Sequence, residues 1–302
     1  MNLEEFVRDI ENIGRSRVFI KEPLLRHNSW KIGGPADVLF IPQTFSALRK
    51  AVRLAEEYEV PITILGNGTN VLIQDSGIEG LVIKLSELRR TVVKENRITA
   101  SAGVSLPYLA SLAQKHGLTG LEFAVGIPGT VGGAVFGNAG AHGRSIQDVV
   151  SEAAVMDFSG RVTKLGSGDL VFGYRTSAFT KDSIILWASF SLQKGSRKAI
   201  RETMDCYLKC RRETQPVGEA TAGCVFKNPP EGSAGYFIEK AGLKGLREGN
   251  ARVSMKHANF IVNEGGATAS DVLRLIEKIK EEVLKEFGVE LKGEIKVLGR
   301  GP

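Results

Sequence analysis

The sequence motif whose residue types best suit a chemical reaction contains one cysteine thiol. Residues 223–229 read Gly-Cys-Val-Phe-Lys-Asn-Pro, which places Cys224 in a glycine-flanked turn close to Lys227 and Asn228. A thiol with a pKa of about 8.5 is mostly protonated at neutral pH, so Cys224 can give up a proton as well as attack, and Lys227 is placed to lower that pKa. A buried, inert cysteine is the alternative. The polar, turn-like surroundings argue against it.

Three other residue types could contribute to a polar site. Arg175 ends the run Phe172-Gly-Tyr-Arg, where its planar guanidinium suits a carboxylate or a developing enolate. The alternative, a surface arginine lying over apolar residues, is the one this motif alone favours. Glu294, in a predicted C-terminal strand, is either an inward catalytic acid or an edge-strand charge, and the pattern alone favours the edge charge. The four histidines lack metal-ligand spacing, and His142 is the one we expect to face a ligand.

Two glycine-rich segments could hold a large phosphate-bearing ligand. Residues 66–70 (Gly-Asn-Gly-Thr-Asn) follow directly on a short apolar strand, and residues 126–143 are dense in glycine. Glycine permits positive φ and close approach of a ligand to the backbone, where successive N–H groups form anion sites. The second segment lacks the Walker A ending and the dinucleotide-binding fingerprint. The first segment alone would indicate a tight hairpin, but the two together favour a cofactor cradle.

The elements that must position these residues predict a mixed α/β fold. Apolar periodicity predicts helices at 3–14, 45–58, 106–116, 196–212 and 268–287. It predicts strands at 36–42, 62–65, 71–73, 81–85, 97–102, 152–158, 161–165, 184–193, 259–263 and 293–298. A change from strand to helix pattern near Gly195 predicts two domains, 1–195 and 196–302. We expect the first to have an N-terminal helix and two lobes, at about 30–90 and 91–195, and the second to be a smaller α/β unit.

Composition excludes several classes of protein. The chain has 302 residues, of which 42% are hydrophobic and 25% charged, as expected for a globular protein with a sizeable core. Its net charge of +6 comes from scattered Lys and Arg without interleaved aromatic residues, which argues against a nucleic-acid partner. No apolar run approaches the roughly 20 residues of a membrane-spanning helix. The sequence thus predicts a small-molecule partner and no membrane or nucleic-acid partner, and it leaves the oligomeric state open.

The three cysteines indicate a reducing compartment. Cys206, Cys210 and Cys224 are too few, and odd in number, for a disulfide framework, so we expect a cytoplasmic protein. Cys206 and Cys210 are four residues apart on a predicted helix. We interpret them as half-buried helix thiols rather than as a metal pair, because no further cysteine pair or histidine accompanies them.

Several motifs in one order carry a family resemblance. They are Asn28-Ser-Trp-Lys-Ile-Gly-Gly, residues 64–72, Gly120-Leu-Glu-Phe-Ala-Val-Gly-Ile-Pro-Gly-Thr-Val-Gly-Gly, residues 172–175, residues 222–229 and Gly293-Glu-Ile-Lys-Val-Leu-Gly. Together they span nearly the whole chain, which resembles the UDP-N-acetylenolpyruvoylglucosamine reductases, flavoenzymes of bacterial peptidoglycan precursor synthesis. The glycine segments alone are similar to the wider vanillyl-alcohol-oxidase-like superfamily. The resemblance implies an FAD-binding domain of that type in two lobes, followed by a substrate domain.

The resemblance also implies a reaction and its residues. It implies non-covalent FAD, NADPH as hydride source, and an enolpyruvyl ether of UDP-N-acetylglucosamine as substrate. Cys224 would donate the proton, and Arg175 and Glu294 would stabilise the enolate-like intermediate. Residues implied to bind the cofactor are Gly66, Asn67, Gly68, Thr69, Asn70, Gly126, Ile127, Pro128, Gly129, Thr130, Gly132, Gly133, Asn138, Ala139, Gly140 and Arg211. Residues implied to bind the substrate are His142, Lys227, Asn228 and His257.

The chain departs from the family pattern in three places. The family usually has serine where this chain has Cys224, and a thiol is the more acidic donor, although it is open to oxidation. Thr214 stands where the family often has a lysine before Gln-Pro, so any role of that lysine is vacant. The chain has no room for the extra tyrosine-bearing segment of one branch, which indicates the shorter branch.

Two other functions compete with the reductase. An FAD-dependent oxidase or dehydrogenase acting on an alcohol or hydroxy acid would use the same glycine segments. Covalent attachment of the flavin would use a histidine or cysteine, and residues 66–70 contain neither. A non-catalytic flavin- or nucleotide-binding module would explain the glycine segments, but it would not explain why Arg175, Cys224 and Glu294 occur together.

Overall fold

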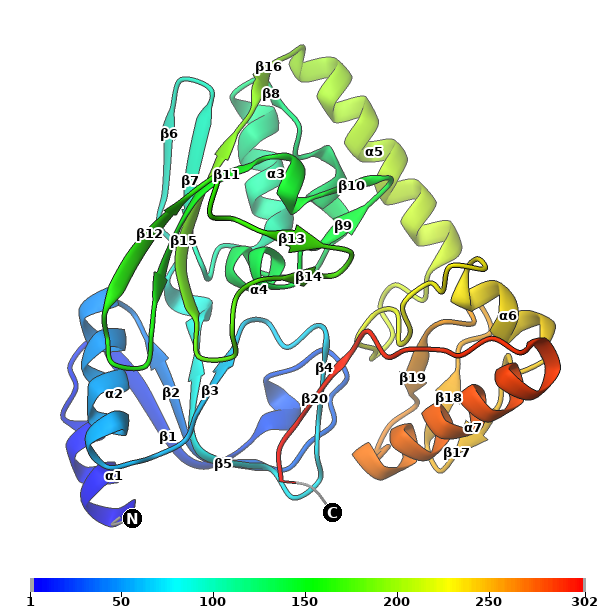
Figure 1. Ribbon diagram of the computed structural model, residues 1–302, viewed down its shortest axis with the longest axis horizontal. Coiled ribbons are helices and arrows are strands. Elements are labelled where there is room, and N and C mark those ends of the chain that lie inside the picture. Colours follow the sequence, from blue (N-terminus) through cyan, green and yellow to red (C-terminus); the bar gives the residue numbers. More distant parts are fainter. Residues whose placement is uncertain (1–2, 301–302) are drawn as a thin grey trace. The chain divides into compact units, whose positions relative to one another are not determined.

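The computed structural model describes residues 3–300, which form two compact units (Figure 1). The first contains the described residues up to Ile20, together with Val38–Asn67 and Gly80–Cys210. The second contains Lys21–Asp37, Gly68–Glu79 and the chain from Arg211 onward. Both units mix helices and strands, so the predicted α/β class is confirmed.

This division differs from the predicted boundary near Gly195. The first unit continues to Cys210, inside helix α5 (Arg197–Thr214), and two early segments belong to the second unit. Trp30 shows why: its side chain is fully buried in the core of the second unit, and its indole Nε1 donates to the Ile261 carbonyl at 3.0 Å. Leu72 is buried in the same core. Periodicity along the chain does not reveal contacts between residues about two hundred positions apart.

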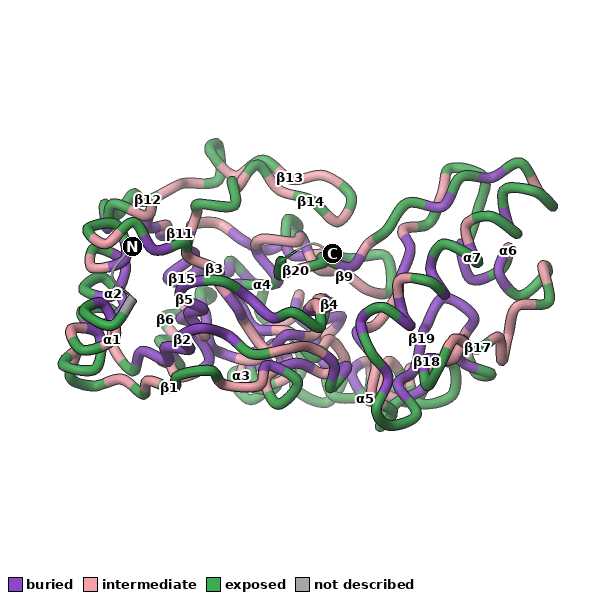
Figure 2. The backbone as a smooth tube through the Cα atoms, turned by 90° about the horizontal axis from the view of Figure 1, so that it is seen from below, coloured by how far each residue is buried: buried purple, intermediate pink, exposed green. Residues whose placement is uncertain are grey.

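Most of a four-stranded sheet, with two helices, belongs to the first unit. Its strand order is β1-β2-β5-β3, and β3 runs parallel to β5. The bounds are β1 Ser16–Pro23, β2 Pro35–Pro42, β5 Ile78–Lys84, β3 Ile62–Leu65, α1 Leu3–Glu11 and α2 Phe45–Glu57. Helices α1 and α2 contact each other (Figure 1), and their apolar faces share a buried cluster with β2 and β5. Strand β2 is buried along almost its whole length (Figure 2), since it lies inside the sheet.

A five-stranded antiparallel sheet forms the other part of the first unit. Its order is β12-β11-β15-β7-β6. The bounds are β12 Val162–Gly166, β11 Val150–Met156, β15 Ile184–Ser191, β7 Arg97–Ser101 and β6 Thr91–Lys94. Helices α3 (Leu106–Lys115) and α4 (Val131–Phe136) share its core. Three short antiparallel pairs complete the unit: β8 Leu118–Thr119 with β16 Gln193–Lys194, β9 Gly140–Ala141 with β10 Arg144–Ser145, and β13 Phe172–Gly173 with β14 Thr176–Ser177.

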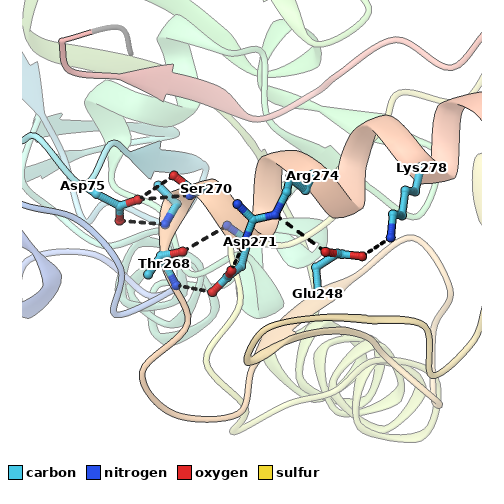
Figure 3. A network of polar contacts seen from close by, with 8 residues as sticks. Asp75, Glu248, Thr268, Ser270, Asp271, Arg274 and Lys278 are labelled. Carbon is cyan, nitrogen blue, oxygen red and sulfur yellow. Dashed lines mark hydrogen bonds and ion pairs between the residues drawn. The ribbon is translucent and has the colours of Figure 1, made fainter.

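The second unit packs two helices with a small sheet. Strands β17 (Arg247–Glu248), β18 (Ala251–Val253) and β19 (Ile261–Asn263) form an antiparallel sheet, and α7 (Ala269–Phe287) and α6 (Ala234–Lys240) share the buried core. Strand β4 (Val71–Ile73) pairs in parallel with β20 (Lys296–Leu298). Asp75, which follows β4, accepts hydrogen bonds from the backbone N–H groups of Ala269 and Ser270 at the start of α7 (Figure 3). The segment after β4 is therefore tied to this helix.

Most regular elements occur where periodicity predicts them. All five predicted helices are present. Each predicted strand corresponds to an observed one, with identical ends at 62–65 and 71–73 and shifted ends elsewhere. The sequence missed β1, β6, α4, α6 and the shortest strands. A strand of two or three residues carries too little pattern, and β1 has eight residues but none that is fully buried. Single-turn 3₁₀ helices also lie at Leu24–Arg26, Leu85–Glu87, Glu122–Gly126 and Ile146–Asp148.

Candidate functional site

The segment that carries Cys224 is held on both sides by backbone hydrogen bonds of the second unit. Val225 donates its N–H to the Asn259 carbonyl at 2.9 Å, and its own carbonyl accepts from the Glu294 N–H at 2.8 Å. Isolated antiparallel bridges pair Cys224 with Phe260, and Phe226 with Gly293. The backbones of Cys224 and Glu294, far apart in sequence, are therefore fixed next to each other.

Cys224 lies within electrostatic range of a cation. It is half-buried, and so is Arg211 near the end of α5. Burial lowers the pKa of the Arg211 guanidinium, and the nearby Cys224 thiolate partly raises that pKa again. Arg211, predicted to bind the cofactor, therefore lies within electrostatic range of the thiol.

Glu294 lies just before a strand rather than inside it. The predicted strand at 293–298 begins only at Lys296, so the edge-strand interpretation of Glu294 is wrong. The side chain is half-buried, and the Glu294 carbonyl accepts from Asn70 Nδ2 at 3.3 Å. Lys296 in turn donates its N–H to the Asn70 carbonyl at 3.0 Å. Asn70, predicted as a cofactor residue, therefore contacts the backbone that carries Glu294.

His257 is held in one tautomer. Its Nδ1 accepts the Asn259 N–H at 3.2 Å, which leaves the ring proton of the neutral form on Nε2. Burial lowers the pKa of His257, and the positive charge of Lys244 lowers it further. At neutral pH the ring is therefore uncharged and presents an N–H donor at Nε2.

Two other predicted substrate residues follow the thiol. Lys227 is half-buried, and its N–H donates to the Lys292 carbonyl at 2.8 Å, which extends the backbone pairing past Cys224. Asn228 is exposed, and its Oδ1 accepts from the N–H of Ala234, the first residue of α6. The Cys224 segment is thus held by hydrogen bonds as far as Asn228, its last candidate substrate residue.

The two predicted glycine segments meet within the first unit. The Asn67 side chain donates to the Pro128 carbonyl at 3.2 Å. A Cβ added to Gly66 would lie 2.8 Å from Thr130 Oγ1, and one added to Gly132 would lie 2.9 Å from the Ala102 Cβ. Gly66 therefore lies against the Thr130 side chain of the second segment, and Gly132 lies against Ala102, so neither position has room for a side chain. Glycine at these positions allows the close approach of other groups to the backbone.

The rest of the first glycine segment belongs to the second unit. Gly68 has φ +63°, and a Cβ there would lie 2.6 Å from the His27 carbonyl. The Gly68 carbonyl accepts the Ser29 N–H at 3.0 Å. Glycine is therefore required at position 68 by both conformation and space.

The second glycine segment is not one continuous loop. It contains α4, which Thr130 caps by accepting the Gly133 N–H, and the β9–β10 hairpin. His142 and Gly143 form the two-residue turn of that hairpin, both with positive φ. The His142 ring is exposed to solvent at the turn and stacks on Tyr207 of α5, with centroids 3.8 Å apart. The glycines hid α4, because they are poor helix formers.

Arg175 occupies the turn of another hairpin. Tyr174 and Arg175 connect β13 to β14, and Arg175 has φ +56°, an uncommon conformation for a residue with a side chain. Its Nη2 donates to the Gly140 carbonyl at 2.8 Å, and its guanidinium lies over the Tyr174 ring at 5.2 Å. Arg175 is therefore aimed by a tight turn and a fixed hydrogen bond, and does not lie loosely over apolar surface.

Asn138 supports the same hairpin from below the surface. It is 3% exposed, and its Nδ2 donates to the Gly173 carbonyl at 2.9 Å and to Gln147 Oε1 at 3.0 Å. Its Oδ1 accepts the Gln147 N–H. Asn138 was predicted to bind cofactor, and these bonds engage both ends of its amide group.

The remaining cysteines differ from expectation in burial. Cys206 and Cys210 lie on α5 as predicted, but both are exposed rather than half-buried. Within residues 3–300, no three His, Cys, Asp or Glu side chains are grouped so as to hold a metal ion. No helix in that range is long and apolar enough to cross a membrane.

Sequence reasoning missed the residue that organises the Cys224 segment. Asn259 is 3% exposed and lies just before β19, in the run His257-Ala-Asn-Phe. A polar residue at the head of an apolar strand is the signal that could have found it, since a buried amide needs hydrogen-bond partners. Tyr207, which stacks on His142, carries no such signal.

Each unit offers a different chemistry. In the second unit, the Cys224 thiol lies within electrostatic range of Arg211, and backbone hydrogen bonds hold the Cys224 segment next to Glu294 and to Asn259, which also bonds the neutral His257 ring. A thiol, a cation, a carboxylate and an imidazole are residue types suited to proton donation and charge stabilisation. The first unit offers joined glycine segments and an aimed guanidinium, a set suited to anionic ligands.

Comparisons with known proteins match the chain over nearly its full length. Residues 215–298 match the family described as UDP-N-acetylenolpyruvoylglucosamine reductase, C-terminal domain, and residues 36–166 match the FAD binding domain family. The UDP-N-acetylenolpyruvoylglucosamine reductase of Caldanaerobacter subterraneus subsp. tengcongensis is 46% identical over 290 residues, 96% of each chain. Reductase 1 of Bacillus anthracis is 43% identical over 99% of this chain and all of its own.

A solved structure matches at the level of the fold. The crystal structure of UDP-N-acetylenolpyruvylglucosamine reductase (MurB) from Thermus caldophilus has a TM-score of 0.81 and 35% identity. The match covers 94% of this chain and 99% of that one. The predicted α/β fold with an FAD-binding domain is therefore confirmed.

Proposed function

This chain belongs to the UDP-N-acetylenolpyruvoylglucosamine reductase family, and we propose that it reduces the enolpyruvyl ether of UDP-N-acetylglucosamine to UDP-N-acetylmuramate, with FAD as non-covalent cofactor and NADPH as reductant. One observation carries the assignment of residues: Val225 bonds both to Asn259 and to Glu294, which fixes the backbones of Cys224 and Glu294 side by side. The oxidase and the binding module would not require this pairing.

The cofactor would be held by the joined glycine segments of the first unit. Gly66, Asn67 and residues 126–133 come together there, and Gly66 and Gly132 leave no space for side chains. Their backbone N–H groups would contact the pyrophosphate. Bound FAD supplies the redox chemistry, a hydride taken from NADPH and passed to the substrate.

The chemistry on the substrate then needs one proton at a defined carbon. Addition of the hydride to the terminal vinyl carbon makes a methyl group and leaves the former double-bond pair on the carbon next to the carboxylate. Cys224 donates its proton to that carbon, which completes the lactyl ether. The net change is one C=C bond reduced, NADPH oxidised to NADP⁺, and one proton consumed, which the thiolate regains from solvent.

Charged neighbours would support these steps. Arg175, aimed by its hairpin, stabilises the negative charge that develops on the substrate carboxylate. Glu294 contributes only if it is protonated or shares a proton, because a bare carboxylate would repel that charge. Arg211 stabilises the thiolate that remains on Cys224 after proton transfer. His257 and Lys227 are assigned to the substrate.

We propose a cytoplasmic location for the protein. Its three cysteines are compatible with a reducing compartment, and the substrate is a small nucleotide sugar. The partner is therefore a small molecule.

The test separates the two half-reactions. Purified protein should show flavin absorbance that NADPH bleaches and that the enolpyruvyl UDP-sugar restores. Cys224→Ala should leave NADPH-driven bleaching intact and lower the substrate-driven step by about 10²–10⁴-fold, the usual worth of a positioned acid. Cys224→Ser should retain substantial activity. Equal loss of both half-reactions in Cys224→Ala would contradict the proton-donor role, and a protein that never binds flavin would contradict the proposed function.

A further inference from the structure

A buried amide group lies behind the proposed proton donor. Asn259 donates from Nδ2 to the Phe226 carbonyl at 2.8 Å, and its Oδ1 accepts the Phe226 N–H at 2.9 Å. These two hydrogen bonds resemble those that a neighbouring strand would make. They satisfy both the N–H and the carbonyl of Phe226, two positions after Cys224. With Asn259 only 3% exposed, solvent does not replace these bonds if the side chain is lost.

The backbone of Asn259 makes two more contacts with proposed site residues. Its carbonyl accepts the Val225 N–H at 2.9 Å, directly next to Cys224. Its N–H donates to His257 Nδ1 at 3.2 Å and so sets the tautomer of that ring. One residue therefore connects the Cys224 segment to His257, and through Val225 it is linked to the backbone of Glu294.

We propose that Asn259 is a positioning residue for the reductase reaction, which fixes the Cys224 segment against Glu294 and holds His257 with its Nε2–H available. This inference rests on the proposed function, since it assumes that Cys224 donates the proton. Asn259 acts through the backbone, and its own amide is fully engaged with Phe226. Its contribution is therefore the geometry of proton donation and not a contact with the substrate.

A second buried asparagine offers a matched control. Asn263, in β19 of the same unit, is 8% exposed. Its Oδ1 accepts from the N–H groups of Gly265 and Ala267, and its Nδ2 donates to the Trp30 carbonyl. These side-chain bonds outnumber the two made by the Asn259 side chain, but none reaches residues 224–227 or 292–294. Asn263→Ala therefore shows how far the loss of a buried amide lowers stability when the Cys224 segment keeps its hydrogen bonds.

The experiment compares Asn259→Ala with Asn263→Ala in the full-length, FAD-loaded protein. In Asn259→Ala, we expect the substrate-driven reoxidation of flavin at saturating substrate to fall by about 10- to 100-fold, because a small misplacement of a reacting group has effects of this size. NADPH-driven flavin reduction should change less than about twofold, since it does not use the thiol. Asn263→Ala should lose comparable thermal stability and keep both rates.

A stereochemical readout separates positioning from general loosening. A displaced thiol lets solvent protonate the enolate from either face, so Asn259→Ala run in D₂O should give product with deuterium at the new stereocentre in both configurations. Wild type and Asn263→Ala should give one configuration. If Asn259→Ala proves too unstable to purify, Asn259→Asp keeps the acceptor for the Phe226 N–H and should show the same selective loss to a smaller degree.

The outcomes distinguish this inference from the proposed function. Equal slowing of both half-reactions in Asn259→Ala, or the same slowing of reoxidation in Asn263→Ala, would overturn the role of Asn259. A wild-type protein that does not turn over the enolpyruvyl UDP-sugar would instead overturn the proposed function. A fully active Cys224→Ala would overturn the proton-donor role on which this inference rests.

Discussion

Arg175 in the first unit and Cys224 in the second are positioned in opposite ways. Arg175 is aimed by a two-residue turn with a positive φ, so most of its geometry comes from the adjoining residues of its own hairpin. Cys224 lies in an irregular segment whose backbone pairs with residues more than thirty and about seventy positions away. In both units a buried asparagine supports the segment: Asn138 below the hairpin, and Asn259 beside the thiol.

This difference in support indicates which substitutions would displace each side chain. A turn can be disturbed by a change of one residue, whereas a segment held on both sides is disturbed by changes in distant strands. Variants that separate local from long-range support therefore test the comparison directly.

Among changes in the first unit, loss of the Arg175 guanidinium should have the largest effect. We expect Arg175→Ala to slow substrate-driven reoxidation of flavin by about 10²–10³-fold, the usual effect of removing one preorganised donor. Arg175→Lys should recover only part of this rate, because an ammonium cannot reproduce the planar fork. Stopped-flow absorbance of the flavin measures both variants. A fully active Arg175→Ala would remove Arg175 from the reaction.

Loss of the amide below the hairpin should have a smaller effect. Asn138→Ala leaves Gly173 and Gln147 without their buried partner, so we expect reoxidation to slow by about tenfold as Arg175 is displaced. In a double-mutant cycle, Asn138→Ala should add little in the Arg175→Ala background, since the two changes remove one interaction. Flavin content is measured alongside, because Asn138 was also assigned to the cofactor. If the effects of Asn138→Ala and Arg175→Ala on the reoxidation rate are fully additive, Asn138 does not act by positioning Arg175.

Substitutions of two aspartates compare how much local and long-range hydrogen bonds contribute to the stability of the fold. Asp75 caps α7 from a segment 194 residues away, through the N–H groups of Ala269 and Ser270 (Figure 3). Asp75→Ala should lower the free energy of unfolding by about 1–2 kcal/mol, the usual cost of a lost helix cap, and lower Tm by several degrees.

Asp157 serves as the local counterpart in the first unit. It accepts hydrogen bonds from Ser159 and Arg161 within its own turn, which also lower its pKa. Asp157→Ala should lower Tm less than Asp75→Ala, because the turn is exposed and water can replace these bonds. Calorimetry of both variants measures the difference. A larger loss in Asp157→Ala would reverse the comparison.

The smallest effect concerns the pH dependence of stability. The pKa of His257 lies below its ordinary value of 6.5, because of burial and the charge of Lys244. The unfolded chain therefore takes up a proton at His257 more readily than the folded chain does. The associated stability is present above pH 6.5 and is lost as pH falls through the lower, folded pKa. Tm should drop less between pH 7.5 and 5.5 in His257→Gln than in wild type, and identical profiles would contradict this assignment.

The sequence predicted the fold better than the domain division. Periodicity located all five longer helices, because each repeats apolar residues at helical spacing over nine or more residues. It did not show that Trp30 and Leu72 belong with the C-terminal core, since nothing local records their distant partners. It also hid α4, because Gly132 and Gly133 are unfavourable in a helix. At Gly132 the close approach of Ala102 leaves no room for a larger residue.

The sequence by itself determined which groups are available. It supplied the thiol of Cys224 in a polar turn, the glycines that let backbone approach a ligand, and the motif order that marks the family. These are properties of residue type and short spacing, so they can be read along the chain.

The tertiary structure alone decided which groups act together. It placed Arg211 beside Cys224, paired the Cys224 segment with Glu294, and buried Asn259 and Asn138 as supports. Each of these contacts joins residues that only the folded chain brings within hydrogen-bonding or electrostatic range. A buried amide or a shared carbonyl has no preferred spacing in sequence, and its partners are set by packing.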